Sequence, residues 1–580
     1  MIKKYLIFTA LIIFMVNFTA ADILGQPDMT AKLTPSDDGA AKKADAFLSQ
    51  WDKNDMPGCG VGAVRDGKLI YKRAFGMANL DYDVPNTAST LFNLASASKP
   101  FTAMSIALLA QQGKLSLDDD IRKYVPEIPK YDQTVTIRHL IHHTGGIREY
   151  QALVFFSGLS PDNAYSDKAI LNILARQKNI SFAPGAKYQY SNSGYFLLGI
   201  IVARVSGKSL RAFAEENIFK PLGMKNTRFY DNRFEVVKNR AHGYRVGSDK
   251  SIRARSSLYD LVGAGGLLSN VEDLSLWNQN FYEPKVGNKE LSQLLTTPGI
   301  LNSGEKMDYS FGLFHNEYKG LPVIKHSGNI ASGYRAQIVS FPEQKFTAIA
   351  LCNNTAIFPS IIAEKLADIY LEGQIKSVAP SQKTVAESLL QAIALPEKEA
   401  QRYAGIYAHL ESGRSFKLSF KGGKLINTGL FRNEIPVTAI SENRLLVVDG
   451  NGMTELNPVF NKSGTVSEIR ILTKSGKPDI FVPVKPSFDS PEALSAYAGT
   501  YYSDEFNADY KILQKDNNFV LQIGEGFEAP LTAAYTDVFT TAGGQINLVF
   551  TRGENGKIVG FVFNSALDER DVKGIAFKRK

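Results

Sequence analysis

Ser96 and Lys99 lie three residues apart in the tetrad Ser-Ala-Ser-Lys, and this pair can support nucleophilic chemistry. A serine hydroxyl is a weak nucleophile until a neighbouring base takes its proton. Because side chains three residues apart on a helix share one face, the lysine can act as the proton partner of the serine. A chain of 580 residues contains several such tetrads by chance, so the surrounding elements decide whether this one is a catalytic site.

The segments on both sides of the tetrad place it at the start of a buried helix. Upstream, residues 60–81 contain two alternating apolar patterns that meet at Asp66-Gly67, a dipeptide typical of a tight hairpin turn. Downstream, residues 100–112 repeat apolar side chains at helical spacing and stop at Gly113. We therefore expect Ser96 at a helix N-terminus, where the helix dipole is positive.

Two further segments carry polar side chains that could complete a site. Residues 188–195, YQYSNSGY, follow the turn at 183–185 and precede an apolar helical pattern, so Tyr190 and Asn192 are predicted on a loop outside the helix. The triplet at 326–328, His-Ser-Gly, follows a strand pattern. The strand patterns lie near both ends of residues 41–373 with helical patterns between them, which indicates an α+β domain whose sheet is built from both chain ends.

Together these three motifs, in this order and at these separations, resemble the penicillin-recognising serine hydrolases: class C β-lactamases, D,D-carboxypeptidases, D-aminopeptidases and related esterases. The resemblance covers about residues 45–370 and includes the stretches TLFNLASASKPFTA, LSLDDDIRKYVPEIP, TIRHLIHHTGGI and GAGGLLSNVEDLSLW. It implies a catalytic domain of the β-lactamase/transpeptidase type, in which helices surround an antiparallel sheet.

The resemblance also implies a role for each motif residue. Ser96 would attack a carbonyl and form an acyl-enzyme, and Lys99 and Tyr190 would form the proton-transfer pair. Neither side chain is a base at neutral pH with its reference pKa, about 10.4 for lysine and about 10 for tyrosine, so each must be tuned by the other. Which of the two is the general base stays open. Asn192 would donate its amide to the acyl-side carbonyl of the substrate.

The third motif would bind the substrate. The resemblance implies an oxyanion hole made of the backbone N–H groups of Ser96 and Asn329, with Asn329 on an edge strand, and substrate contacts from His326, Ser327 and Gly328. β-Lactamases of this class carry Lys-Thr-Gly at the triplet. A histidine is mostly neutral at pH 7, so tight recognition of a free carboxylate by position 326 is not expected. The His-x-Gly triplet resembles the D-aminopeptidase and esterase-like branches more than the antibiotic-hydrolysing one.

An internal repeat follows the catalytic region. Tyr403–Tyr407 recurs as Tyr497–Tyr501, and with the same offset 416–426 matches 510–520. Short alternating segments separated by Gly, Asn and Asp predict two small antiparallel β-barrel-like modules, as in three-domain D-aminopeptidases. The expected division of the chain is a signal peptide at 1–21, a hydrolase domain at 22–375, a linker at 376–394, and β modules at 395–486 and 487–580.

The N-terminus reads as a secretory signal, with two lysines, an apolar stretch and small residues up to Ala21. We therefore expect a periplasmic or secreted protein with no stable membrane span once the signal is removed; an uncleaved anchor is the alternative. The chain has 66 basic and 58 acidic residues, and the basic residues are scattered, so a nucleic-acid partner is not expected.

The cysteines and histidines do not form a metal motif. Cys59 and Cys352 are far apart in sequence; the resemblance places their strands side by side and antiparallel, which would allow a disulfide, and two buried free thiols are the alternative. His139, His142 and His143 have no partner at zinc spacing, so no metal and no cofactor is expected. The glycine-rich segment 263–266 is predicted as close-packed backbone near the site and not as a phosphate loop.

The sequence thus predicts an exported serine hydrolase that acts through an acyl-serine on peptides or small amides of D-amino-acid character, of the D-aminopeptidase or D,D-carboxypeptidase type. Its partners would be a small-molecule or peptide substrate, cell-wall peptidoglycan fragments included. A carboxylesterase or weak β-lactamase with the same residues is one alternative. Another is a non-catalytic protein that binds the cell wall through its β modules, against which the intact Ser96, Lys99 and Tyr190 argue.

Overall fold

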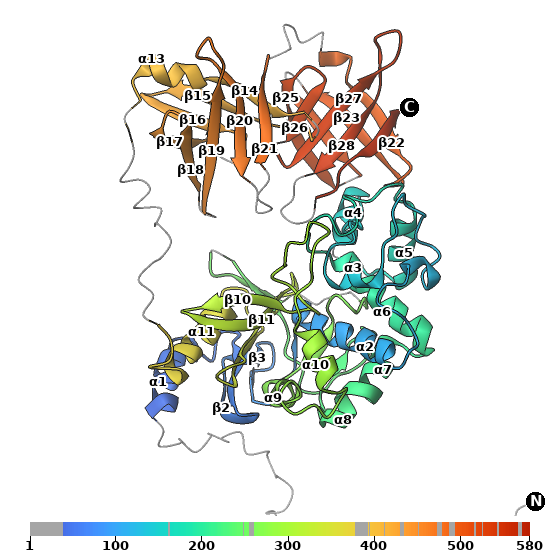
Figure 1. The fold of residues 1–580 in the computed structure, drawn as a ribbon, viewed down its shortest axis with the longest axis vertical. Helices are drawn as coiled ribbons and strands as arrows, with labels where there is room; N and C mark the ends of the chain where they lie inside the picture. Colours follow the sequence, from blue (N-terminus) through green and yellow to red (C-terminus); the bar gives the residue numbers. More distant parts are fainter. Residues whose placement is uncertain are drawn as a thin grey trace, which may run out of the picture.

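The computed structural model has an α+β body below two barrels that lie next to each other (Figure 1). It describes residues 39–160, 163–247, 249–254, 260–376, 393, 395–410, 412–429, 434–449, 452–472, 478–485, 494–515, 518–524, 526–541, 544–565 and 571–580. The predicted signal peptide and most of the predicted linker lie outside these residues. Among the described residues, no helix is long and apolar enough to cross a membrane.

The catalytic body is built on an antiparallel sheet with the order β10-β11-β12-β13-β1-β2. Its strands are β1 (Cys59–Arg65), β2 (Lys68–Phe75), β10 (Phe314–Tyr318), β11 (Leu321–Asn329), β12 (Arg335–Phe341) and β13 (Phe346–Cys352). The hairpin predicted at Asp66-Gly67 joins β1 to β2, and both turn residues have positive φ. Strands from both ends of the domain therefore form one sheet, as expected.

A disulfide joins the neighbouring strands β1 and β13 in the middle of this sheet. Cys59 pairs with Cys352 in the register of β1 and β13, and their sulfur atoms are bonded. Both residues are fully buried beneath the helices of the outer face. Of the two alternatives for the cysteines, the structure therefore has the disulfide.

Helices cover both faces of the sheet. α1 (Gly39–Leu48) and α11 (Pro359–Tyr370) pack on one face, and α9 (Val271–Gln279) contacts β1, β2 and β13 on the other. The helical region beyond α9 contains α2 (Lys99–Gln111), α3 (Ile137–Ile141), α4 (Tyr150–Phe156), α5 (Asp167–Ala175), α6 (Asn192–Ser206), α7 (Leu210–Ala214), α8 (Lys220–Leu222) and α10 (Lys289–Leu295). α2 is the centre of this region, because almost all of its side chains are buried and it packs against α6, α7 and α10.

Short strands in the connecting segments of the catalytic body form small sheets. They form the pairs β3 (Met77–Asn79) with β4 (Val84–Pro85) and β7 (Tyr244–Val246) with β8 (Ile252–Ala254), and the sheet of β5 (Phe92–Asn93), β9 (Leu267–Ser269) and β6 (Arg228–Phe229). β5 leads directly into the tetrad that contains Ser96, so this small sheet positions the chain immediately before the nucleophile.

The repeat folds as two closed antiparallel barrels, which confirms the predicted β modules. The first comprises β14 (Gly405–His409), β15 (Arg414–Lys421), β16 (Lys424–Thr428), β17 (Ile435–Ser441), β18 (Arg444–Asp449), β19 (Gly452–Phe460), β20 (Val466–Leu472) and β21 (Pro478–Val484), preceded by α13 (Glu397–Ala400). The second comprises β22 (Gly499–Ser503), β23 (Ala508–Lys515), β24 (Asn518–Ile523), β25 (Phe527–Tyr535), β26 (Val538–Thr541), β27 (Ile546–Arg552), β28 (Ile558–Ser565) and β29 (Ile575–Arg579).

Each barrel has an equivalent buried hydrogen bond between two tyrosines where its chain segment begins. The Tyr407 hydroxyl donates to the carbonyl oxygen of Tyr403 at 2.8 Å, and the Tyr501 hydroxyl donates to that of Tyr497 at 2.8 Å. The second barrel lies beside α4 and α5 of the catalytic body (Figure 1), where the Tyr510 hydroxyl donates to the carbonyl oxygen of Phe156 at 2.7 Å.

Candidate active site

Ser96 lies in a 3-10 turn, η2 (Ala95–Ser98), that leads into α2. The α-helix itself begins at Lys99, so Ser96 lies at the N-terminal entry to this buried helix, as expected. The Ser98 hydroxyl donates to the carbonyl oxygen of Ala95 at 2.6 Å and accepts from the Leu267 N–H of β9 at 3.1 Å. Ser96 remains partly exposed while its neighbours in the turn are buried, so its hydroxyl is the one that a substrate can reach.

Lys99 connects the nucleophile to two other segments. Its side chain is fully buried, and its Nζ donates to Ser96 Oγ at 3.1 Å, to Asn192 Oδ1 at 2.8 Å and to the carbonyl oxygen of Ala264 at 2.8 Å. The same nitrogen lies 4.7 Å from the centre of the Tyr190 ring and 5.5 Å from that of Tyr195. The structure therefore brings together the residues that the first two motifs nominated.

The second motif lies at the N-terminus of α6. Tyr190 precedes the helix, and the Ser191 side chain caps it by accepting from the Gly194 N–H at 3.2 Å. Asn192 was expected on the loop but is the first residue of α6. Its Nδ2 donates to Gln151 Oε1 at 3.3 Å while its Oδ1 accepts from Lys99, so its amide is held on both sides.

His143 is a site residue that the sequence did not assign to the site. Its ring centre lies 4.4 Å from that of Tyr190, and its Nδ1 accepts from the Ser191 N–H at 3.0 Å. Burial, followed by the positive charge of Lys99, holds the pKa of His143 well below its usual value. His143 is thus a neutral ring that packs against Tyr190 and accepts a hydrogen bond from the next residue, Ser191. The only signal for it was the histidine cluster itself.

The other two histidines of this cluster have separate structural contacts. His139 Nδ1 accepts from the Thr136 N–H at 3.2 Å in the capping box of α3. The His142 ring packs edge-on against Phe311, with ring centres 5.5 Å apart. In the part of the chain that the structure describes, no group of three or more His, Cys, Asp or Glu side chains could hold a metal ion.

His326 lies on β11 with its ring buried. Its Nδ1 donates to the carbonyl oxygen of Ser327 at 2.6 Å, which leaves Nε2 to accept from the Tyr309 hydroxyl at 3.3 Å. Burial and then the charge of Lys99 lower the pKa of His326 to about 3. The imidazole is therefore neutral at neutral pH and cannot provide a cation for a substrate carboxylate.

The end of β11 packs against the turn of the nucleophile. A Cβ at Gly328 would lie 1.9 Å from the carbonyl oxygen of Leu94, so only glycine permits this approach. β11 was expected at the sheet edge, but β10 lies outside it. β10 pairs with β11 over Leu321–Lys325, and Asn329 at the end of β11 extends beyond this pairing toward the Ser96 turn.

The glycine-rich segment 263–266 is close-packed backbone at the site, as predicted. Ala264 accepts from Lys99, the Thr102 hydroxyl donates to the carbonyl oxygen of Gly263 at 2.8 Å, and a Cβ at Gly263 would lie 2.5 Å from the carbonyl oxygen of Tyr195. The sequence could not nominate Ala264, because it contributes a backbone carbonyl that any residue type would provide.

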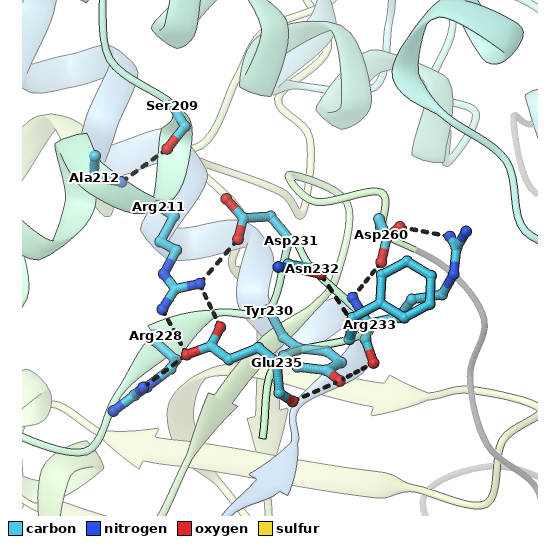
Figure 2. A network of polar contacts seen from close by, with 11 residues as sticks. Ser209, Arg211, Ala212, Arg228, Tyr230, Asp231, Asn232, Arg233, Glu235 and Asp260 are labelled. Carbon is cyan, nitrogen blue, oxygen red and sulfur yellow. Dashed lines mark hydrogen bonds and ion pairs between the residues drawn. The ribbon is translucent and has the colours of Figure 1, made fainter. Parts of the chain in front are cut away.

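A network of ion pairs and hydrogen bonds includes Asp260, three residues before this segment (Figure 2). Asp260 accepts from the Arg233 N–H at 2.6 Å and from its guanidinium at 2.5 Å, and the Tyr230 N–H donates to the carbonyl oxygen of Gly266 at 2.7 Å. Arg211 ties the same region to α7 through Glu235, at 2.5 and 2.9 Å. The contacts at Asp260 and Gly266 thus lie on either side, in sequence, of the Ala264 carbonyl that accepts from Lys99.

The α+β fold and the Ser-Lys-Tyr cluster define a serine hydrolase of the β-lactamase type. The family described as Beta-lactamase matches residues 44–367, so the chain belongs to this family and is a serine hydrolase. The resemblance found in the sequence is therefore confirmed.

Relatives differ in how much of the chain they match. "Penicillin-binding protein 4*" of Bacillus subtilis is 32% identical over 320 residues, covering 53% of this chain and 70% of that protein. "D-aminopeptidase" of Brucella canis is 23% identical over 543 residues, covering 90% of this chain and 96% of that protein. The fold is similar to the solved octameric penicillin-binding protein homologue from Pyrococcus abyssi, with a TM-score of 0.53, 24% identity, and coverage of 76% of this chain and 99% of that one.

Proposed function

We propose that this protein is an exported serine hydrolase that cleaves amide bonds in D-amino-acid-containing peptides or small amides through an acylated Ser96. The observation that carries the proposal is the hydrogen bond between the buried Lys99 Nζ and Ser96 Oγ, beside the Tyr190 ring. A hydroxyl in contact with a buried proton partner is an activated nucleophile.

In the proposed reaction Ser96 Oγ attacks the carbonyl carbon, and its proton passes to the pair of Lys99 and Tyr190. The backbone N–H groups of Ser96 and Asn329 stabilise the oxyanion. The pair then protonates the leaving amine, and a water molecule hydrolyses the acyl-enzyme with the same groups in reverse. Asn192 orients the acyl-side carbonyl.

Two observations favour an aminopeptidase over a carboxypeptidase or a β-lactamase. The triplet at 326–328 would line the subsite for the leaving group, and its neutral, buried His326 offers no cation for a carboxylate there. The D-aminopeptidase relative also extends over the barrels, whereas the penicillin-binding protein relative matches about half of the chain. The neutral His326 also suits an uncharged ester, so a carboxylesterase is the second candidate.

A substrate panel tests the proposal. D-Alanyl and L-alanyl p-nitroanilide form a matched pair, to be compared with short acyl esters, a D-alanyl-D-alanine peptide and a chromogenic cephalosporin. We expect the D-anilide to be cleaved at least about a hundredfold faster than the L-anilide, and Ser96→Ala to retain less than about a thousandth of the activity. Fast ester cleavage without preference for the D-anilide would instead identify a carboxylesterase. Absence of both turnover and Ser96 acylation would identify a binding protein.

Export has its own test. The proposed signal peptide at 1–21 predicts that mature protein recovered from the exported fraction begins at Asp22, which N-terminal sequencing would determine. Protein that starts at Met1 and sediments with membranes would instead support the uncleaved anchor.

A further inference from the structure

A buried ion pair joins the second barrel to the catalytic body. Glu505, in the connection between β22 and β23, accepts from Arg148 Nη1 at 2.5 Å, and the two side chains are only 4% and 1% exposed. The same carboxylate accepts from the Lys178 N–H at 2.9 Å. Arg148 also donates to Gln177 Oε1 at 3.1 Å and to the carbonyl oxygen of Lys573 at 2.7 Å. The barrel therefore fixes the position of Arg148 from two of its own segments.

Such a pair is costly to bury, because both charges lose their hydration. It holds its geometry only when the remaining hydrogen-bonding atoms are also satisfied, as they largely are here through backbone and amide partners of both domains. Lys178 and Asp504 form a second pair nearby at 3.3 Å, but those side chains are 62% and 57% exposed. Exposed pairs of this kind contribute little, so the buried pair is the informative contact.

The residue after Arg148 holds the N-terminus of α6. Glu149 Oε2 accepts from the Asn192 N–H at 2.6 Å and from the Ser193 N–H at 3.3 Å. In return the Ser193 hydroxyl donates to the carbonyl oxygen of Arg148 at 2.7 Å and accepts from the Tyr150 N–H at 2.7 Å. Buried hydrogen bonds in both directions therefore make residues 148–150 and the first turn of α6 one unit.

This unit reaches the nucleophile in two further contacts. Asn192 Oδ1 accepts from Lys99 Nζ, and Lys99 Nζ donates to Ser96 Oγ. We propose that Glu505 of the second barrel is a positioning residue for the active site, because it anchors Arg148 and thereby sets where Glu149 holds Asn192 relative to Lys99. The inference rests on the proposed function of Ser96 as the acylated residue.

The structure offers a matched control at the same interface. Tyr510 is also a buried barrel residue, and its hydroxyl donates to the carbonyl oxygen of Phe156 at the far end of α4. Tyr510→Phe removes one interdomain hydrogen bond without touching residues 148–150. If the barrel merely stabilises the protein, Glu505→Gln and Tyr510→Phe should affect catalysis alike.

The test measures the rate at which a fluorophosphonate probe labels Ser96 in the full chain, together with kcat and KM on the best anilide. We expect Glu505→Gln to lower the labelling rate and kcat about tenfold with KM within about twofold, since small misplacements of reacting groups have large effects on rate. Tyr510→Phe should leave both rates within about twofold. Equal rates in Glu505→Gln and wild type would overturn the inference.

A double-mutant cycle separates positioning from loss of stability. Residues that act as a unit give non-additive losses, so Glu505→Gln should cost no more than about twofold in a Glu149→Ala background. Losses that multiply would contradict action through Glu149. If Glu505→Gln fails to fold, the double variant Arg148→Met/Glu505→Met replaces it in the test, because it leaves no buried charge without its partner. This double variant should fold and lose labelling of Ser96 about tenfold. Wild-type protein that is not labelled at Ser96 would reject the proposed function instead.

Discussion

Lys99 organises the site at the scale of single residues, because its ammonium donates to oxygens from three segments distant in sequence. An ammonium has three donors, and Ser96, Asn192 and Ala264 each accept a hydrogen bond from it in the resting geometry. Attack by Ser96 therefore changes the hydrogen-bonding of Lys99 directly. Any group that takes the serine proton must act within this arrangement, beside the Tyr190 ring.

The proton-transfer pair should behave as a unit. We predict that Lys99→Ala and Tyr190→Phe each lower kcat about a hundredfold or more, and that the double variant loses less than about tenfold beyond the worse single variant. Steady-state kinetics on the best anilide provides the measurement. Tyr188→Phe, a change of the same kind two residues away, should stay within about threefold. Losses that multiply would show that the two residues act independently.

Because His326 is buried and neutral in the folded protein, the free energy of unfolding depends on pH. Its folded pKa of about 3 lies below the unfolded value of about 6.5, so below pH 6.5 the unfolded chain binds more protons and stability falls as acid is added. Each such histidine contributes up to about 1.4 kcal/mol per pH unit in this window. We predict that wild type loses about 1.6 kcal/mol more than His326→Gln between pH 6.5 and pH 5, measured by urea unfolding. Identical pH slopes would contradict the burial of a neutral ring.

Residue types and spacing could predict part of this site. Ser96, Lys99, Tyr190 and His326 each belong to a short contiguous motif, so the sequence revealed them together. Ala264 and Glu149 could not be found in this way. The first contributes a backbone carbonyl, and the second binds backbone N–H groups, so neither contact depends on a recognisable pattern of residues.

At the scale of elements, the close approach of β11 to the η2 turn shapes the proposed oxyanion hole. The sequence pattern predicted the strand and the turn separately. It could not predict that β10 stops at the level of Lys325 and so leaves the end of β11 free to approach Ser96, because the register of a short outer strand depends on tertiary packing.

This contact predicts a strong effect of one added methyl group. Gly328→Ala places a Cβ against the Leu94 carbonyl, so β11 and η2 must separate. We expect a loss of about 1–3 kcal/mol in stability from overpacking and a fall of about a hundredfold in kcat. Gly526→Ala, where an added Cβ meets no atom within 4 Å, is the control and should change neither. Wild-type kcat in Gly328→Ala would show that the contact does not set the geometry of the site.

At the scale of the whole molecule, the two barrels are similar in structure but differ in their contacts. The repeat predicted the barrels, since alternating strands are a local pattern. Docking could not be predicted, because Arg148 and Glu505 are 357 residues apart and neither lies in a distinctive motif. The repeat offset aligns Tyr510 with Phe416, so the hydroxyl that contacts Phe156 is present in the second barrel and absent from the first.

The shared tyrosine hydrogen bond allows the barrels to be compared directly. Tyr407→Phe and Tyr501→Phe each remove a hydroxyl that donates to a backbone carbonyl oxygen. We predict that each variant loses about 1–3 kcal/mol in stability, measured by urea unfolding, while kcat stays within about twofold. A large loss of kcat from Tyr407→Phe would show that the first barrel also acts on the site.

The pairing of β1 with β13 has a consequence for biosynthesis. Cys59 and Cys352 are 293 residues apart, and at about 5–20 residues per second a ribosome needs roughly 15–60 s to make that stretch. During this interval the edge of β1 that later pairs with β13 has no neighbouring strand. An unpaired strand edge of this kind is prone to pair with other chains. The nascent enzyme must therefore be shielded until its central sheet can close, whereas each barrel can form soon after its own strands emerge.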